Sequence, residues 1–196
     1  MTIKKLTARK HYLIPIMLIF LCSCADGCKE EELTTVFVGD SNTYLAGDLW
    51  PGKNKGINGA TTSTLLEKRG YDDLKYPDVI YLNIGVNDLA AGVSIPQIIK
   101  NYEELITEYK GAELHCIAVY PINKEKYKEF FKIESDHYKY ATCENVANLN
   151  AQIKKLCDDY EVDFITVPFP CPNPYTKDGL HLNNKGYDMV MEAIGY

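Results

Sequence analysis

An α/β fold with a central parallel sheet is predicted for this 196-residue chain from two observations. Short apolar and β-branched runs alternate with stretches in which apolar residues recur at helical spacing, as in sheets whose strands are joined by helices. Polar segments that contain glycine follow these runs, at the edge where sheets of this kind bind ligands. The chain is 46% hydrophobic and 24% charged, which suits one globular domain with a full core.

Four apolar or β-branched runs indicate strands, and three amphipathic stretches indicate helices. The strands are expected at Thr34–Gly39, Asp78–Gly85, Leu114–Tyr120 and Val162–Val167. The helices are expected at Pro96–Lys110, at Val146–Tyr160 and at about Asn184–Ile194. Strands and helices in this alternation predict a parallel sheet that is covered by helices on both faces.

The N-terminal segment has the features of a signal peptide. Three lysines and an arginine lie within the first ten residues, and an apolar run follows from Tyr12 to Leu21. The apolar run is shorter than the roughly 20 residues that a membrane-spanning helix needs, which favours a cleaved signal over a permanent anchor.

The end of this segment, Leu21-Cys22-Ser23-Cys24, resembles the lipobox of bacterial lipoprotein signals. In a lipobox, a leucine three places ahead and a small residue just before precede the cysteine that is diacylated. Cys24 fits because Ser23 is small, whereas lipidation of Cys22 would put Leu21 at the small-residue position. A plain secretory signal is the alternative.

The lipobox resemblance implies three parts. Residues 1–23 are the signal peptide, residues 24–32 a tether and residues 33–196 the domain, which acyl chains would hold at a membrane of the bacterial cell envelope. This membrane could present the domain to the periplasm or at the cell surface. Loss of the signal changes the formal net charge from −6 to −10, so the domain is a poor candidate for binding nucleic acid.

The remaining cysteines show no pattern of a metal or redox site. They are Cys28, Cys116, Cys143, Cys157 and Cys171. An odd number cannot all pair, and their spacing contains neither a CxxC pair nor a Cys/His metal pattern. Cys116 lies in an apolar strand, where a small buried hydrophobe is expected. We expect no catalytic cysteine and no metal, and one or two disulfides are compatible with the sequence.

Four glycine-containing polar segments carry the residue types of acyl transfer. They are Gly39–Ser41, Gly56–Thr61, Gly85–Asp88 and Asp178–His181. A serine hydroxyl needs a base within hydrogen-bond reach, and an imidazole base needs an acceptor that fixes its tautomer. The sequence therefore predicts Ser41 as nucleophile, His181 as base and Asp178 as the partner of His181.

The oxyanion of such a reaction needs hydrogen-bond donors aimed at it. The backbone N–H groups of Ser41 and Gly59 and the side-chain amide of Asn87 are the candidates. Ser41 is also expected to open a helix, whose N-terminal dipole favours the developing negative charge. Asp88 is expected to brace its loop rather than to serve in the triad.

The same segments resemble the four sequence blocks of the SGNH (GDSL-type) hydrolases in order and spacing. GDS at 39–41, the glycine of NGAT at 58–61, GVND at 85–88 and DGLH at 178–181 carry the resemblance, which spans residues 34–196. It implies a three-layer α/β/α fold of the flavodoxin-like kind and ester hydrolysis through an acyl-serine, with no metal or organic cofactor. It also implies a triad of Ser41, Asp178 and His181 and an oxyanion hole of Ser41, Gly59 and Asn87.

The substrate is less well defined by the sequence. Asn42 stands where many relatives carry a hydrophobic residue, and residues 122–142 are an elaboration rich in lysine and aromatic rings. These rings, and Trp50, could stack on sugar faces or simply pin their segments to the body. We expect removal of a small O-acyl group, such as acetyl, from a carbohydrate. A lysophospholipase or acyl thioesterase, an O-acyltransferase and a catalytically silent binding module are the alternatives.

Overall fold

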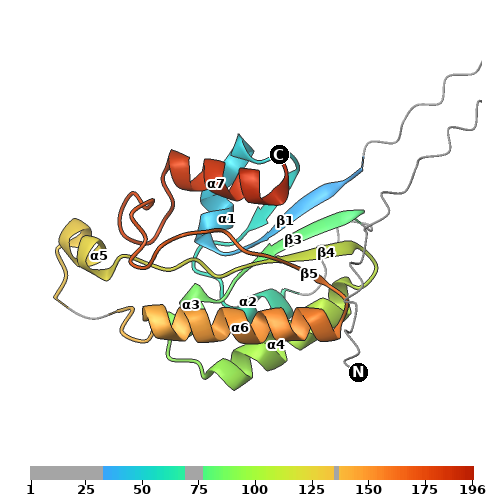
Figure 1. Cartoon of the computed structure of the whole chain (residues 1–196), viewed down its shortest axis with the longest axis horizontal. Coiled ribbons are helices and arrows are strands. Elements are labelled where there is room, and N and C mark those ends of the chain that lie inside the picture. Colours follow the sequence, from blue (N-terminus) through green and yellow to red (C-terminus); the bar gives the residue numbers. More distant parts are fainter. Residues whose placement is uncertain (1–32, 69–76, 135–136) are drawn as a thin grey trace, which may run out of the picture. The chain divides into compact units, whose positions relative to one another are not determined.

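A five-stranded parallel sheet forms the centre of the domain (Figure 1). The structure is a computed structural model, which describes residues 33–68, 77–134 and 137–196. The expected signal peptide and tether lie outside the described residues. The strands are β1 (Thr35–Gly39), β2 (Lys53–Gly56), β3 (Val79–Asn83), β4 (Glu113–Ile117) and β5 (Asp163–Ile165).

The strand order is β2-β1-β3-β4-β5, and each pair of neighbours is parallel. This is the order of the flavodoxin-like sheet, so the predicted fold class is confirmed. The register pairs Gly39 with both Gly56 and Asn83, so β1, β2 and β3 end at one level. The segments that leave these three strands therefore begin side by side.

The helices cover both faces of the sheet (Figure 1). They are α1 (Ser41–Ala46), α2 (Thr62–Glu67), α3 (Val86–Ala90), α4 (Ile95–Tyr109), α5 (Lys124–Phe131), α6 (Cys143–Asp159) and α7 (Asn184–Ile194), with a 3-10 turn η1 at Gly47–Leu49. One buried cluster joins the sheet to α2, α4 and α6, and a second joins it to α1 and α7. The second cluster contains Trp50, which is 3% exposed and packs on Phe37, so Trp50 is a core residue.

The three helices predicted from the sequence are confirmed, and two of them start slightly earlier than expected. The helix expected from Pro96 begins one residue earlier, because Ser94 caps it and places the proline within the first turn. The helix expected from Val146 begins at Cys143, because Thr142 accepts a hydrogen bond from the backbone N–H of Asn145. In the described part of the chain, no helix is both long and apolar enough to cross a membrane.

Strand β2 at Lys53–Gly56 was not predicted from the sequence. Its sequence, Lys-Asn-Lys-Gly, has none of the apolar alternation that indicates a strand. The strand forms at the edge of the sheet by pairing with β1. Gly56 lies so close to the backbone of Tyr44 in α1 that a Cβ atom would not fit. Strand β2 therefore forms because of its contacts with β1 and α1, and its own sequence does not indicate a strand.

Candidate active site

The turn after β1 presents Ser41 as the first residue of α1, as the sequence predicted. Asp40 caps this helix, because its Oδ1 accepts a hydrogen bond of 2.9 Å from the backbone N–H of Asn42. Gly39 permits the tight turn, since a Cβ there would collide with the carbonyl oxygen of Asn83 on β3. Ser41 is 3% exposed, so its hydroxyl is held at a fixed place above the end of the sheet.

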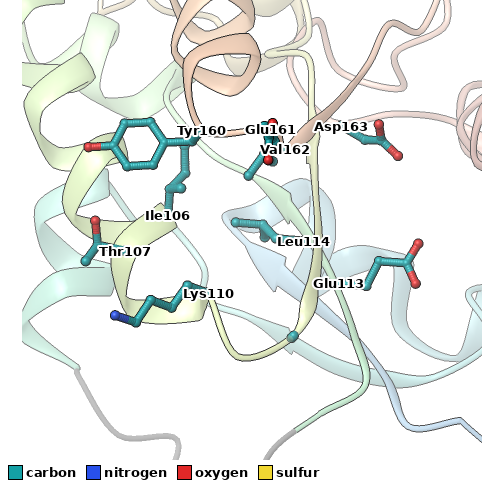
Figure 2. Close-up of a pocket in the computed structure, with 10 residues that line it drawn as sticks. Ile106, Thr107, Lys110, Glu113, Leu114, Tyr160, Glu161, Val162 and Asp163 are labelled. Carbon is teal, nitrogen blue, oxygen red and sulfur yellow. The ribbon is translucent and has the colours of Figure 1, made fainter.

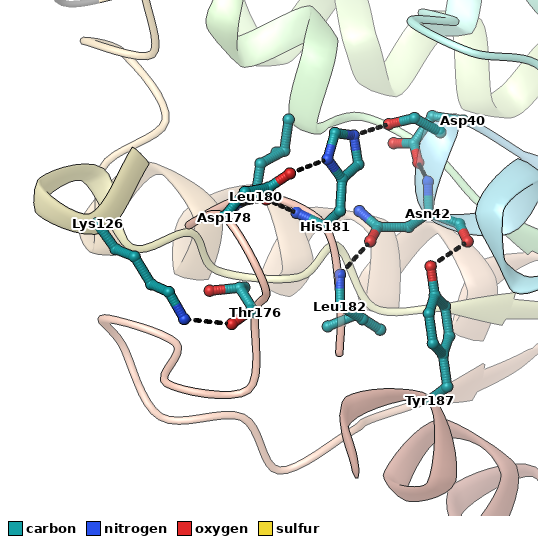
Figure 3. Close-up of polar contacts among 10 residues, drawn as sticks. Asp40, Asn42, Lys126, Thr176, Asp178, Leu180, His181, Leu182 and Tyr187 are labelled. Atoms are coloured by element: carbon teal, nitrogen blue, oxygen red, sulfur yellow. Dashed lines mark hydrogen bonds and ion pairs between the residues drawn. The ribbon is translucent and has the colours of Figure 1, made fainter. Parts of the chain in front are cut away.

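The loop before α7 brings His181 to this serine, and Asp178 lies beside His181 in the same loop (Figure 3 shows Asp178 and His181). The Nε2 atom of His181 lies 3.1 Å from Ser41 Oγ, and its Nδ1 atom lies 2.6 Å from Asp178 Oδ2. An ionised carboxylate only accepts hydrogen bonds, so Nδ1 carries the proton and Nε2 accepts from the serine hydroxyl. The three residues predicted as a triad thus form one continuous chain of hydrogen bonds.

Asp178 is kept ionised by the shape of its own loop. Burial would raise the pKa of this carboxyl, but the hydrogen bond from His181 and two backbone hydrogen bonds outweigh burial and lower the pKa below its ordinary value. The backbone donors are the N–H groups of Leu180 and His181, at 3.0 and 2.8 Å from Oδ1. The tight loop therefore supplies the charge that stabilises an imidazolium at His181.

The candidate oxyanion donors Gly59 and Asn87 follow β2 and β3, the strands on either side of β1. The Gly59 loop is tied to the end of β1, where the N–H of Ile57 donates to the carbonyl of Gly39 at 2.9 Å. Gly59 is exposed and has a positive φ of 72°, which glycine adopts readily. Asn87 Nδ2 donates to the carbonyl of Ala60 at 2.9 Å. The two candidate donors are thus coupled to each other at the edge that carries Ser41.

Asp88 braces the same two loops, as expected from the sequence. Its carboxylate accepts hydrogen bonds from the backbone N–H and the hydroxyl of Thr62, at 3.0–3.1 Å and 2.6 Å. Asn101 on α4 donates to the same hydroxyl at 2.7 Å. Asp88 is fully buried, and burial raises its pKa although these hydrogen bonds lower it. This network holds α2, α3 and α4 in place behind the candidate site.

Asn42, which directly follows Ser41, has two contacts that sequence reasoning missed. Asn42 Oδ1 accepts a hydrogen bond of 2.9 Å from the backbone N–H of Leu182, and the hydroxyl of Tyr187 donates to the Asn42 carbonyl at 3.1 Å (Figure 3). The deviation of Asn42 from the family pattern was the available signal, but its partners lie about 140 positions away.

Helix α5 forms from the elaboration at residues 122–142 and packs against the Asp178–His181 loop. The N–H of Asn123 donates to the carbonyl of Gly179 at 2.7 Å, and Lys126 Nζ donates to the carbonyl of Thr176 at 2.5 Å (Figure 3). The rings divide into two groups. Tyr127 and Tyr138 are in contact at 4.9 Å between ring centroids and pin the segment to the core.

The outer rings of α5 face the solvent. Phe130 and Phe131 contact each other at 5.0 Å between centroids and are 59% and 43% exposed. They are therefore not folded into an apolar slot. His137, in the same elaboration, is exposed as well. His115, in contrast, is largely buried on β4, where it stacks on Tyr81. Its ring lies within 3.4 Å of carboxylate oxygens of Glu113, two residues earlier on β4, and of Asp163, its register partner on β5.

One disulfide links the start of α6 to the segment that leads into the candidate site. It joins Cys143 and Cys171. Cys116 and Cys157 carry free thiols, and Cys116 is fully buried as expected for a small hydrophobe. Cys28 lies outside the described residues. Across the described ranges, no group of three or more His, Cys, Asp or Glu side chains is arranged to hold a metal ion.

A separate pocket of about 580 Å³ opens near the amino ends of strands β4 and β5 (Figure 2). It lies between the end of α4 and the starts of β4 and β5, and its lining includes Lys110, Glu113, Tyr160 and Asp163. The triad lies beyond the opposite, carboxyl ends of the strands. This pocket is therefore not part of the candidate active site.

The geometry agrees with a comparison against protein families. The model of the GDSL-like lipase/acylhydrolase family matches residues 37–189, and this chain belongs to that family. It is accordingly a hydrolase of the class that acts on ester bonds. A search of curated proteins gave no significant match.

Several solved structures are similar to this domain. A Bacteroides fragilis protein assigned as an acylhydrolase is 21% identical, with a TM-score of 0.70 over 84% of this chain and 86% of its own. A Streptococcus pneumonia protein assigned as a platelet activating factor is 27% identical, with a TM-score of 0.64 over 85% and 84%. An acetylxylan esterase of Geobacillus stearothermophilus is 17% identical, with a TM-score of 0.62 over 83% and 94%.

Proposed function

We propose that this protein is a serine carboxylic ester hydrolase that removes small O-acyl groups, acetyl above all, from a carbohydrate. The observation that carries the proposal is the chain of hydrogen bonds from Ser41 Oγ through His181 to Asp178, with lengths of 3.1 and 2.6 Å. A hydroxyl, a neutral imidazole and an ionised carboxylate in this order are the parts that nucleophilic acyl transfer requires.

The proposed reaction has two halves. Ser41 Oγ attacks the ester carbonyl while His181 Nε2 takes the hydroxyl proton, and the carbonyl oxygen becomes an oxyanion. The N–H groups of Ser41 and Gly59 and the amide of Asn87 would bind this oxyanion. His181 then returns the proton to the leaving alcohol. In the second half, water gives a proton to His181 and attacks the acyl-serine. His181 then returns this proton to Ser41 Oγ as the acyl–oxygen bond breaks, which releases the carboxylic acid and regenerates the Ser41 hydroxyl.

The preference for a small acyl group is supported by the exposure of α5. Phe130 and Phe131 could form a slot for a fatty-acyl chain only by folding inward, but they are 59% and 43% exposed. An acyl chain gains binding energy only where it is removed from water, at up to about 0.8 kcal/mol per methylene. Acetylxylan esterases among the structural neighbours are consistent with an acetylated glycan as substrate.

A series of p-nitrophenyl esters tests the acyl preference. We expect kcat/KM to be highest for acetate or propionate and to decline from butyrate to octanoate, because longer chains find no apolar wall. A rate that climbs steadily to octanoate would support a lysophospholipase or thioesterase instead. Transfer products formed when a sugar acceptor is added would indicate an acyltransferase. Absence of any turnover would leave a silent binding module.

We also propose that the domain is anchored through Cys24 at a membrane of the bacterial cell envelope. The lipobox-like sequence supports this, and so does the Cys143–Cys171 disulfide, because disulfides persist in oxidising compartments such as the periplasm or the cell surface. Cys24→Ser should abolish palmitate labelling and release the protein from the membrane fraction, whereas the control Cys28→Ser should stay lipidated. A Cys24→Ser protein that remains lipidated and pelletable would refute this anchor.

A further inference from the structure

We infer that Asn42 is a positioning residue, which sets the distance between Ser41 and His181 by holding the backbone of Leu182. This inference rests on the proposed function, because it assigns a role in the same triad. Asn42 directly follows Ser41 and Leu182 directly follows His181, so two adjacent residues of one segment bind two adjacent residues of another.

Two consecutive hydrogen bonds, here called rungs, join these two segments, which lie 140 positions apart in the chain. The first rung is Ser41 Oγ to His181 Nε2 at 3.1 Å, and the second is the Leu182 N–H to Asn42 Oδ1 at 2.9 Å. Asn42 and Leu182 are 2% and 1% exposed. Water therefore competes little for the second rung, and a hydrogen bond in such a dry place is stronger than one at the surface.

Asn42 is itself fixed from two further directions. Its backbone N–H donates to Asp40 Oδ1 at 2.9 Å, and its carbonyl accepts from the hydroxyl of Tyr187 at 3.1 Å. Tyr187 lies on α7, the helix that begins directly after the His181 loop. The backbone of Asn42 is thus held by the β1–α1 turn on one side and by α7 on the other, and its side-chain Oδ1 accepts from Leu182 on this fixed backbone.

The hydrogen bonds of Asp178 have a different effect from that of the Asn42–Leu182 contact. They join Asp178 to His181 and Leu180 inside a single loop, so they orient the imidazole but do not fix that loop relative to Ser41. The Asn42–Leu182 hydrogen bond adds a buried constraint between the two segments directly beside the Ser41–His181 contact. A displacement of about 1 Å between reacting groups can lower a rate about 100-fold, so this constraint is one that catalysis would sense.

Three substitutions at Asn42 test the inference on the full mature domain with p-nitrophenyl acetate. Asn42→Leu is of similar size and has no acceptor, Asn42→Ser is too short to reach Leu182, and Asn42→Asp keeps the Oδ1 acceptor. We expect the first two to lower kcat and the rate of fluorophosphonate labelling about 10- to 100-fold, with KM within about twofold. Asn42→Asp should recover most of the rate, because a carboxylate also accepts from the Leu182 N–H.

Asn150 on α6 provides a matched control on the other face of the sheet from α1 and α7. Its Oδ1 also accepts from a backbone N–H, that of Val119, at 2.8 Å. Asn150→Leu should lower the melting temperature and leave kcat of the folded protein unchanged. All rates are measured well below the melting temperature of each variant, so that loss of stability does not appear as loss of rate.

Two results would overturn the inference alone. The first is an active wild type and a folded Asn42→Leu variant whose kcat lies within about threefold of the wild-type value. The second is an Asn42→Asp variant as slow as Asn42→Leu, which would show that the rate does not depend on the Oδ1 acceptor. If Asn42→Leu does not fold, Asn42→Ser carries the same expectation. A folded wild type without turnover would overturn the proposed function and this inference with it.

Discussion

At the scale of single residues, Asn87 has two amide hydrogens and two proposed uses for them. One hydrogen bond goes to the carbonyl of Ala60 at 2.9 Å, which leaves the second N–H for the oxyanion. We expect Asn87→Ala to lower kcat on the order of 10²–10³-fold with little change in KM, because an oxyanion donor acts mainly in the transition state.

Asn145→Ala is the control for this prediction. Its amide also donates to a backbone carbonyl, that of Tyr140, but it lies at the start of α6. This variant should keep the wild-type kcat. An Asn87→Ala variant with near wild-type kcat would remove Asn87 from the oxyanion hole and leave it as a brace for the Gly59 loop.

Asp40 predicts a pH dependence of stability. Burial raises the pKa of this carboxyl to about 7 from 3.8, although the Asn42 N–H opposes the shift. Between these two pH values the folded protein holds a proton that the unfolded chain has lost, so folding becomes less favourable as pH rises, at up to about 1.4 kcal/mol per unit. Asp40→Asn keeps the cap acceptor and removes this penalty.

The melting temperatures of Asp40→Asn and of the wild type, measured from pH 4 to pH 8, test this account. The difference in favour of the variant should widen by several degrees as pH rises, since about 1 kcal/mol corresponds to 2–4 °C for a domain of this size. A difference that stays constant across the range would show that Asp40 is already ionised in the folded protein at acid pH.

At the level of helices and loops, the contact between α5 and the Asp178–His181 loop depends on Gly179. This glycine has a φ of 94°, and a Cβ at this position would collide with the Asn123 carbonyl and the Tyr127 N–H. Gly179→Ala should therefore destabilise the domain by about 2–4 kcal/mol and lower kcat, because the loop that holds Asp178 and His181 must shift. Gly111→Ala, at a site where a Cβ meets nothing within 4 Å, should change neither.

Denaturant melts and kcat of the two alanine variants give the comparison. If Gly179→Ala retained both stability and rate, α5 would be an appendage with no bearing on the loop.

The elements that the sequence predicted correctly are those with their own burial pattern. Strands β1 and β3 consist almost entirely of buried residues, β4 and β5 carry shorter apolar runs, and α4, α6 and α7 each carry an apolar stripe. Strand β2 and the short helices α2, α3 and α5 have no such pattern. β2 forms by pairing with β1, and α2 forms around the Thr61 cap and the Asp88 network.

The same distinction applies to the candidate site. The identities of Ser41, His181 and Asp178 follow from local motifs, and so does the short reach between Asp178 and His181 within one loop. The Asn42–Leu182 contact and the docking of α5 on Gly179 are contacts between distant segments, and no local spacing encodes them.

At the scale of the whole domain, the topology explains how residues at opposite ends of the chain meet. β1 lies between β2 and β3, while β5 lies at the far edge of the sheet. The chain must return from β5 across the carboxyl edge before α7 can pack on the face that α1 shares, through Tyr187 and Val190. This return path carries Cys171, Asp178 and His181 past the end of β1. The loop therefore brings His181 to Ser41 as a consequence of strand order.

The central claim is that Ser41 and His181 act as one unit, and a double-mutant comparison of kcat tests it most directly. Ser41→Ala and His181→Ala should each lower kcat by several orders of magnitude, and the double variant should be hardly slower than either, because each single change already disables the shared nucleophile. Losses that multiply in the double variant would show two independent contributions and contradict the hydrogen-bonded triad as the working site.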